Sequence, residues 1–131
     1  LIVSYKGWRI CPLICYDLRF PVWSRNTNEY DLLIYVANWP SIRINAWDTL
    51  LRARAIENMT YCIGVNRVGE DENGYKYNGH TAVYNFLGEK ISSTIEGKEK
   101  VLQCVVFKTK LLKLRQKLNF LQDQDAFKIE K

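Results

Sequence analysis

The chain has 131 residues, enough for one domain, and its 47% apolar and 25% charged residues exclude bulk disorder. Seven Gly and three Pro exclude collagen-like and low-complexity chains. No apolar run approaches the ~20 residues of a membrane-spanning helix, and the net charge of +5 is mild. We therefore expect neither a membrane nor a nucleic acid as partner.

The first half of the chain predicts buried strands and one strong helix. Residues 8–16 and 31–37 are nearly continuous apolar runs with β-branched side chains, a pattern typical of buried parallel strands. Between them, Pro21 predicts the start of a short helix. Residues 43–60 carry apolar side chains at helical spacing and predict the main helix. Residues 61–68 predict a third buried strand.

The second half is richer in turn residues. Residues 69–79 are polar and predict a surface loop. Residues 80–86 and 89–94 flank a Leu-Gly pair and predict a hairpin. The remaining expected elements are a strand at 101–107 and a helix at 109–118. Alternating buried strands and a strong helix, followed by hairpin strands, predict a layered α/β architecture.

Two features of composition bear on the compartment and on partners. The cysteines are Cys11, Cys15, Cys62 and Cys104. Most lie in apolar, strand-like runs, as free thiols of a reducing compartment do, so we expect a cytoplasmic protein without disulfides. A single His is too few for a common zinc site. The basic residues between Lys98 and Lys131 are interpreted as a solvated helix face.

Cys15 is the first candidate for chemistry. It lies at the C-terminal end of the first predicted buried strand, and open α/β sheets place their ligand sites at that edge. A nucleophile on a sharp corner there projects from the sheet, and the backbone N–H of Tyr16 can point at a developing oxyanion. The alternative is a buried inert thiol, which is the commoner case for a cysteine judged by spacing alone.

The loop after the second predicted strand should lie at the same edge. Trp39 either walls a small pocket or caps the edge of the core, and the sequence leaves both open. Arg43 can pair with a carboxylate, although a solvated side chain is the favoured interpretation. His80 is the one possible base for a Cys–His pair, but a hydrogen-bonded structural histidine is favoured.

Two carboxylates lie in apolar surroundings with an arginine close in sequence. Asp17 is near Arg19, and Glu57 is near Arg54. Because an unpaired buried charge is costly, we interpret both pairs as buried ion pairs.

Residues 9–21, RICPLICYDLRFP, resemble the nucleophile segment of the nitrilase (carbon–nitrogen hydrolase) superfamily, with its Cys-Tyr-Asp-x-Arg-Phe-Pro signature. Further segments match in the same order: DLLIYVANWP (31–40), WDTLLRARAIEN (47–58), GVNR (64–67) and GHTAVYNFLG (79–88). The resemblance covers essentially the whole chain and is closest to omega-amidases, which hydrolyse the terminal amide of 2-oxoglutaramate and 2-oxosuccinamate. Val22 stands where the superfamily often has Glu.

The resemblance implies a four-layer αββα sandwich and a Glu–Lys–Cys triad in which Cys15 is the nucleophile. It implies a thioester intermediate, with the Tyr16 backbone N–H as oxyanion donor and with no metal or organic cofactor. The residues expected to bind substrate are Asn38, Trp39 and Arg43. Those expected to give structural support are Asp17, Arg19 and Glu57.

In this superfamily the Glu and Lys motifs lie upstream of the cysteine, and the chain starts at Leu1 without a Met. We therefore expect residues 1–131 to be the C-terminal part of a single carbon–nitrogen hydrolase domain, inactive alone. The expected partners are a small amide substrate, the missing N-terminal half and a second copy of the protein. Two alternatives stay open: a binding or interaction module in which Cys15 is structural, and a Cys–His hydrolase using His80.

Overall fold

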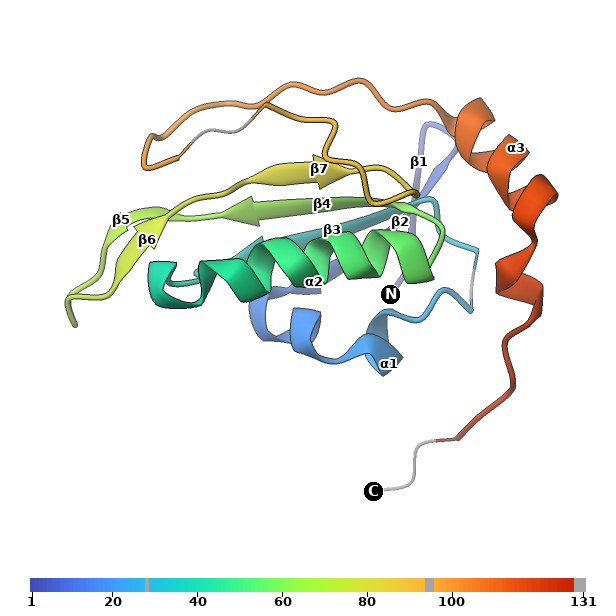
Figure 1. The fold of residues 1–131 in the computed structure, drawn as a ribbon, viewed down its shortest axis with the longest axis horizontal. Coiled ribbons are helices and arrows are strands. Elements are labelled where there is room, and N and C mark those ends of the chain that lie inside the picture. The colour runs from blue at the N-terminus through green and yellow to red at the C-terminus, as the bar shows by residue number, and fades with distance from the viewer. Residues whose placement is uncertain (28, 94–95, 129–131) are drawn as a thin grey trace.

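The computed structural model describes residues 1–27, 29–93 and 96–128, and a five-stranded mixed sheet is its centre (Figure 1). The sheet order is β1 (Val3–Tyr5), β2 (Trp8–Ile14), β3 (Leu32–Ala37), β4 (Tyr61–Asn66) and β7 (Ala82–Tyr84). The three central strands are parallel, as the continuous apolar runs predict, and the two edge strands are antiparallel to their neighbours. The edge strand β1 was not expected from the sequence.

One face of the sheet is covered by α2 (Ile44–Glu57), the helix predicted at 43–60. Trp47 and Leu51 of this helix are fully buried in one cluster with Leu33 and Tyr35 of β3. Gly64 of β4 lets the helix approach closely, because a Cβ there would lie 2.3 Å from Cδ1 of Leu51. This face is a closed core.

The opposite face of the sheet is apolar and open. The register places Pro12, Ile34 and Ile63 in one row across β2, β3 and β4. The next row on this face consists of Ile14, Val36 and Val65. The exposed fractions of this second row are 70%, 57% and 42%. Parallel sheets are normally buried on both faces, so this sheet lacks a cover over part of one face.

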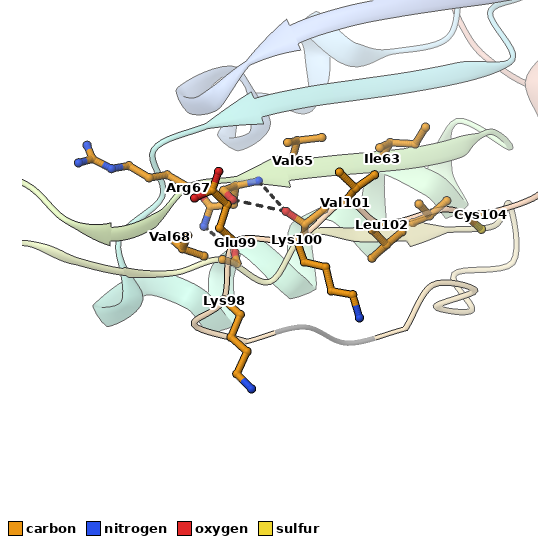
Figure 2. A pocket seen from close by; sticks show the side chains of 14 residues that line it. Ile63, Val65, Arg67, Val68, Lys98, Glu99, Lys100, Val101, Leu102 and Cys104 are labelled. Carbon is orange, nitrogen blue, oxygen red and sulfur yellow. Dashed lines mark hydrogen bonds between the residues drawn. The ribbon is translucent and has the colours of Figure 1, made fainter.

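Residues 101–107 form an extended segment that passes over the sheet on the side opposite to α2 (Figure 1). Figure 2 shows Val101, Leu102 and Cys104 of this segment beside Ile63 and Val65 of β4, around a groove of about 630 Å³. The prediction of a strand at 101–107 is wrong, because this stretch forms no ladder with any described residue. Exposed and half-buried residues nevertheless alternate along this stretch, as they do in a strand.

The C-terminal helix α3 (Lys108–Leu118) confirms the predicted helix, and a charged cluster fastens it to the start of β3. The buried carboxylate of Asp31 lies 2.8 Å from Nζ of Lys108 and 3.5 Å from Nη1 of Arg115. Arg115 also donates to the carbonyl oxygens of Met59 and Tyr30. The interpretation of these basic residues as a solvated face is wrong for Lys108 and Arg115, since both serve the docking of α3.

Turns and short elements complete the chain. The short helix after Pro21 is confirmed as α1 (Pro21–Ser24), and 3-10 turns occur as η1 (Cys15–Arg19), η2 (Ser41–Arg43) and η3 (Phe120–Gln122). The predicted surface loop contains a hairpin, β5 (Val68–Glu70) and β6 (Lys76–Asn78).

The hairpin predicted from 80–86 and 89–94 is reduced to β7 and one bridge from Tyr84 to Lys90, with Thr94 outside the described residues. No helix of the described part of the chain has the length and apolar character to cross a membrane.

Candidate active site

Cys15 lies at a sharp corner where β2 ends and η1 begins. Its φ of +40° is in the left-handed region, which non-glycine residues seldom adopt and which is often found at functional sites. The turn is held by Asp17, whose Oδ2 accepts a hydrogen bond from the backbone N–H of Ile14 at 2.9 Å. The side chain of Cys15 is partly exposed at the C-terminal edge of the parallel strands.

The residues predicted for the site meet around one cavity of about 80 Å³. Its lining consists of Cys15, Tyr16, Arg19, Asn38, Trp39, Pro40 and Arg43. The nucleophile segment and the loop after β3 are therefore adjacent, as parallel neighbouring strands require. The volume is that of about three water molecules, too small to enclose a linear amide. The described residues thus form one wall of a site rather than a closed pocket.

Trp39 belongs both to the core edge and to the cavity wall. Its indole is 3% exposed, packs 5.6 Å from the ring of Trp47, and donates from Nε1 to the carbonyl oxygen of Arg43. The side chain of Asn66 holds the backbone of Trp39 at both of its polar groups. Oδ1 of Asn66 accepts a hydrogen bond from the N–H of Trp39 at 2.7 Å, and Nδ2 donates to the carbonyl oxygen of Trp39 at 3.0 Å. Sequence reasoning gave Asn66 no role, although it lies within the GVNR segment.

The expected ion pair between Asp17 and Arg19 does not form. The carboxylate of Asp17 turns back to Ile14, while the guanidinium of Arg19 lies 4.8 Å from the centroid of the Trp39 ring. Arg19 is exposed and lines the cavity, so it contributes charge to the site. Arg43 is also exposed and lines the same cavity, so two arginines border the site of Cys15, and guanidinium groups suit an anionic ligand.

The second expected ion pair is present. Nη1 of Arg54 lies 3.0 Å from Oε1 of Glu57, and the arginine side chain is 4% exposed. Nη2 of Arg54 donates to the carbonyl oxygen of Leu18 at 2.7 Å. Glu57 therefore supports η1, the turn that begins at Cys15, through Arg54.

His80 does not line the Cys15 cavity. Its Nδ1 lies 2.8 Å from Oδ2 of Asp48 on α2, and its Nε2 lies 3.6 Å from Oε1 of Glu96. This is the hydrogen-bonded histidine that the sequence favours, and it links the segment before β7 to the main helix. The alternative of a Cys–His pair with Cys15 receives no geometric support.

The other thiols have different surroundings. Cys11 and Cys62 are buried in the core, and burial raises the pKa of both thiols, which disfavours the reactive thiolate form. All four cysteines are free. Across residues 1–27, 29–93 and 96–128, no group of three His, Cys, Asp or Glu side chains is arranged to hold a metal ion.

The sheet with α2 on one face and the corner at Cys15 place the chain in a known class of proteins. It belongs to the carbon–nitrogen hydrolase family, whose model matches residues 2–106. Among curated relatives, omega-amidase YafV of Escherichia coli K12 is 49% identical over 129 residues, which are 98% of this chain and 50% of that protein. A 2-oxoglutaramate amidase of Paenarthrobacter nicotinovorans is 35% identical over 114 residues, covering 86% of this chain and 38% of that protein.

Solved structures agree with the family. A CN-hydrolase superfamily protein of Xanthomonas campestris, solved with an arsenic adduct in its active site, has a TM-score of 0.94 and 44% identity. The match covers 99% of this chain and 52% of that one. An amidase of Nesterenkonia shares the fold with a TM-score of 0.80 at 21% identity. The chain thus spans about half the length of the omega-amidases it matches, 49–50% of each.

Proposed function

We propose that the protein containing this chain is an amidase of the omega-amidase type. It hydrolyses the terminal amide of a small linear substrate, an omega-amide of a 2-oxo acid, to a carboxylate and ammonia. The observation that carries the proposal is Cys15 at its strained corner, in a cavity lined by two arginines and in a chain 49% identical to an omega-amidase. Residues 1–131 act as the C-terminal part of a single hydrolase domain.

In the proposed reaction, the thiolate of Cys15 attacks the amide carbon and a C–S bond forms. The backbone N–H of Tyr16 donates to the resulting oxyanion. The C–N bond then breaks, the nitrogen takes a proton and leaves as ammonia, and a thioester remains. Water attacks the thioester, the C–O bond forms, the C–S bond breaks, and the thiol is restored. The Glu that the family uses as general base, and the Lys that also stabilises the oxyanion, come from the upstream half.

The substrate class is supported by charge. Arg19 and Arg43 line the cavity, and their guanidinium groups match the geometry of a carboxylate. An omega-amide of a 2-oxo acid carries its carboxylate at the end opposite to the amide. With the amide carbon at Cys15, the carboxylate of a short chain reaches these arginines. Asn38 and Trp39 supply the polar and flat walls beside it.

The upstream half of the domain is the partner proposed for the open sheet face. The exposed row of Ile14, Val36 and Val65 needs an apolar cover. The unpaired segment 101–107 needs a neighbouring strand. A second sheet meets both needs, as in a four-layer sandwich. A second copy of the whole protein would complete a homodimer, and the free thiols suit the cytoplasm.

The test compares the chain alone with the chain joined to the upstream half. The joined protein should release ammonia from 2-oxoglutaramate, and the chain alone should not. Cys15→Ser in the joined protein should abolish turnover by at least about 10³-fold, since the nucleophile is lost. Cys104→Ser is the matched control, because this partly exposed thiol lies outside the cavity, and it should keep turnover. Turnover retained by the folded Cys15→Ser protein would contradict the proposal.

The open sheet face also favours one second candidate, a structural or interaction module that performs no chemistry. In that case the joined protein would fold but release no ammonia, and Cys15 would react with alkylating agents no faster than Cys104.

A further inference from the structure

The β5–β6 hairpin, unassigned so far, lies beside η2, whose last residue lines the Cys15 cavity. Figure 1 shows it projecting beyond the sheet on the side where α2 begins. β6 packs against η2, and Arg43 at the end of η2 lines the Cys15 cavity. A linear substrate whose amide lies at Cys15 and whose other end extends past Arg43 therefore meets the hairpin next.

The hairpin shares an anchor with the cavity wall. Nδ2 of Asn66 donates both to the carbonyl oxygen of Trp39, at 3.0 Å, and to that of Gly79, at 2.7 Å. Gly79 directly follows β6, so one buried amide group holds the cavity loop and the base of the hairpin together. Nδ2 of Asn78 adds a hydrogen bond of 3.2 Å to Glu96. The hairpin thus has a fixed position relative to the site.

Tyr77 is the residue of this hairpin that is held most firmly. Its hydroxyl donates to Oδ2 of Asp71 at 2.7 Å, and the guanidinium of Arg67 lies 4.9 Å from its ring centroid. Arg67 is itself tied by a 3.0 Å hydrogen bond to the carbonyl of Glu70. Tyr77 is half-buried, whereas the nearby Tyr75 is 56% exposed. Asp71 and Arg67 thus hold the ring in one position.

We propose that Tyr77 is a specificity-determining residue that limits the length of substrate between the amide at Cys15 and the far end of the molecule. This inference rests on the proposed amidase function. The clamp formed by Asp71 and Arg67 keeps the ring in place, so that a substrate one methylene too long collides with it. Removing the ring lengthens the space beyond Arg43 and leaves Cys15, Tyr16 and the arginines as they are.

The test uses the joined protein and three 2-oxo acid omega-amides with backbones of four, five and six carbons. Tyr77→Ala should raise kcat/KM for the six-carbon substrate relative to the five-carbon one by about tenfold, the lower end of what one methylene is worth in a fitted pocket. Tyr77→Leu, which keeps an apolar side chain on the hairpin, should shift the ratio in the same direction. Tyr75→Ala is the matched control and should leave the ratio unchanged. A ratio in Tyr77→Ala equal to that of Tyr75→Ala overturns the proposal.

A second readout separates this inference from the amidase proposal. Alkylation of Cys15 by a short and a long linear iodoacetamide needs no turnover, and the long-to-short rate ratio should rise in Tyr77→Ala and Tyr77→Leu. If the joined wild-type protein releases no ammonia, the amidase proposal fails and the alkylation ratio alone decides on Tyr77. An unchanged alkylation ratio in both variants, with their circular dichroism spectra intact, rejects Tyr77 as a limit on length.

Discussion

The two faces of the sheet differ in a way that separates folding from function. On the face covered by α2, Leu33, Tyr35, Trp47 and Leu51 have no exposed surface. On the other face, Ile14 is 70% exposed and Val36 is 57% exposed, although both are apolar. The covered face contains the closed core of this chain. The open face leaves apolar side chains of the same strands exposed, which supports the proposal that a neighbour covers them, and Cys15 lies at the edge where these strands end.

The largest expected effect distinguishes the two faces by stability. Leu51→Ala removes a fully buried side chain and should lower the free energy of unfolding of the chain by about 2–5 kcal/mol. Val36→Ala on the open face should change it by less than about 1 kcal/mol in the chain alone, because most of that side chain already faces water. Urea unfolding followed by circular dichroism measures both. Equal losses would show that the open face is buried in solution.

The joined protein sharpens the same comparison. With the upstream half present, Val36→Ala should become as costly as a core substitution, about 1 kcal/mol or more. If it stays neutral there, the upstream half does not cover this face.

The next effect concerns the end of the sheet opposite the hairpin. Asp31→Ala leaves Lys108 and Arg115 without their buried carboxylate and should cost about 3 kcal/mol. The control is Glu29→Ala. The Glu29 side chain is 87% exposed, and its carboxylate is loosely paired with Arg9 at 3.9 Å. The free energy of unfolding of this variant should therefore lie within about 0.5 kcal/mol of the wild-type value. Thermal and urea unfolding give both values. A neutral Asp31→Ala would mean that α3 docks without this cluster.

A smaller effect compares the thiols of the closed core with the one at the edge. Near neutral pH, iodoacetamide should label Cys15 roughly a hundredfold faster than Cys11 and Cys62, since both core thiols are buried and burial raises their pKa. Peptide mapping by mass spectrometry resolves the sites. Comparable rates at Cys15 and Cys62 would mean that the core opens or that Cys15 is shielded.

The smallest effect is local to the hairpin. The hydrogen bond donated by the Tyr77 hydroxyl is the main reason why the pKa of Asp71 lies below its ordinary value of 3.8, because this bond stabilises the charged carboxylate. Tyr77→Phe should therefore raise this pKa toward 3.8. The clamp in the wild type holds at neutral pH and is lost as the pH falls through the lowered pKa of Asp71. NMR titration of the carboxyl carbon of Asp71 measures the shift, and no shift would show that the pair does not exist in solution.

Much of the fold could be predicted from patterns that depend on burial. The continuous apolar runs gave β2, β3 and β4, and the helical spacing after residue 43 gave α2. The segment 101–107 has the alternation of a strand, yet a strand exists only with a partner, and the described residues provide none. The hairpin at Val68–Asn78 was missed because its strands are short and polar, and its stability comes from Asp71 and Asn66 rather than from apolar side chains.

The candidate site was predictable where it depends on topology. Cys15 and the loop of Trp39 meet because neighbouring parallel strands end at one edge. The position of Arg19 was not predictable, since a 3-10 turn carries its side chain onto Trp39 and away from Asp17. Asn66 was missed for a similar reason: its contacts join segments that lie far apart in the sequence.

The central claim is that Cys15 forms a thioester with the substrate, and trapping that intermediate tests it most directly. The joined protein is mixed with 2-oxoglutaramate, quenched in acid within the first turnovers, digested and analysed by mass spectrometry. We predict that the peptide containing Cys15 carries the mass of the substrate less ammonia, and that hydroxylamine removes it. Ammonia released at the wild-type rate with no acyl group on Cys15, or with the group on another residue, would contradict the account.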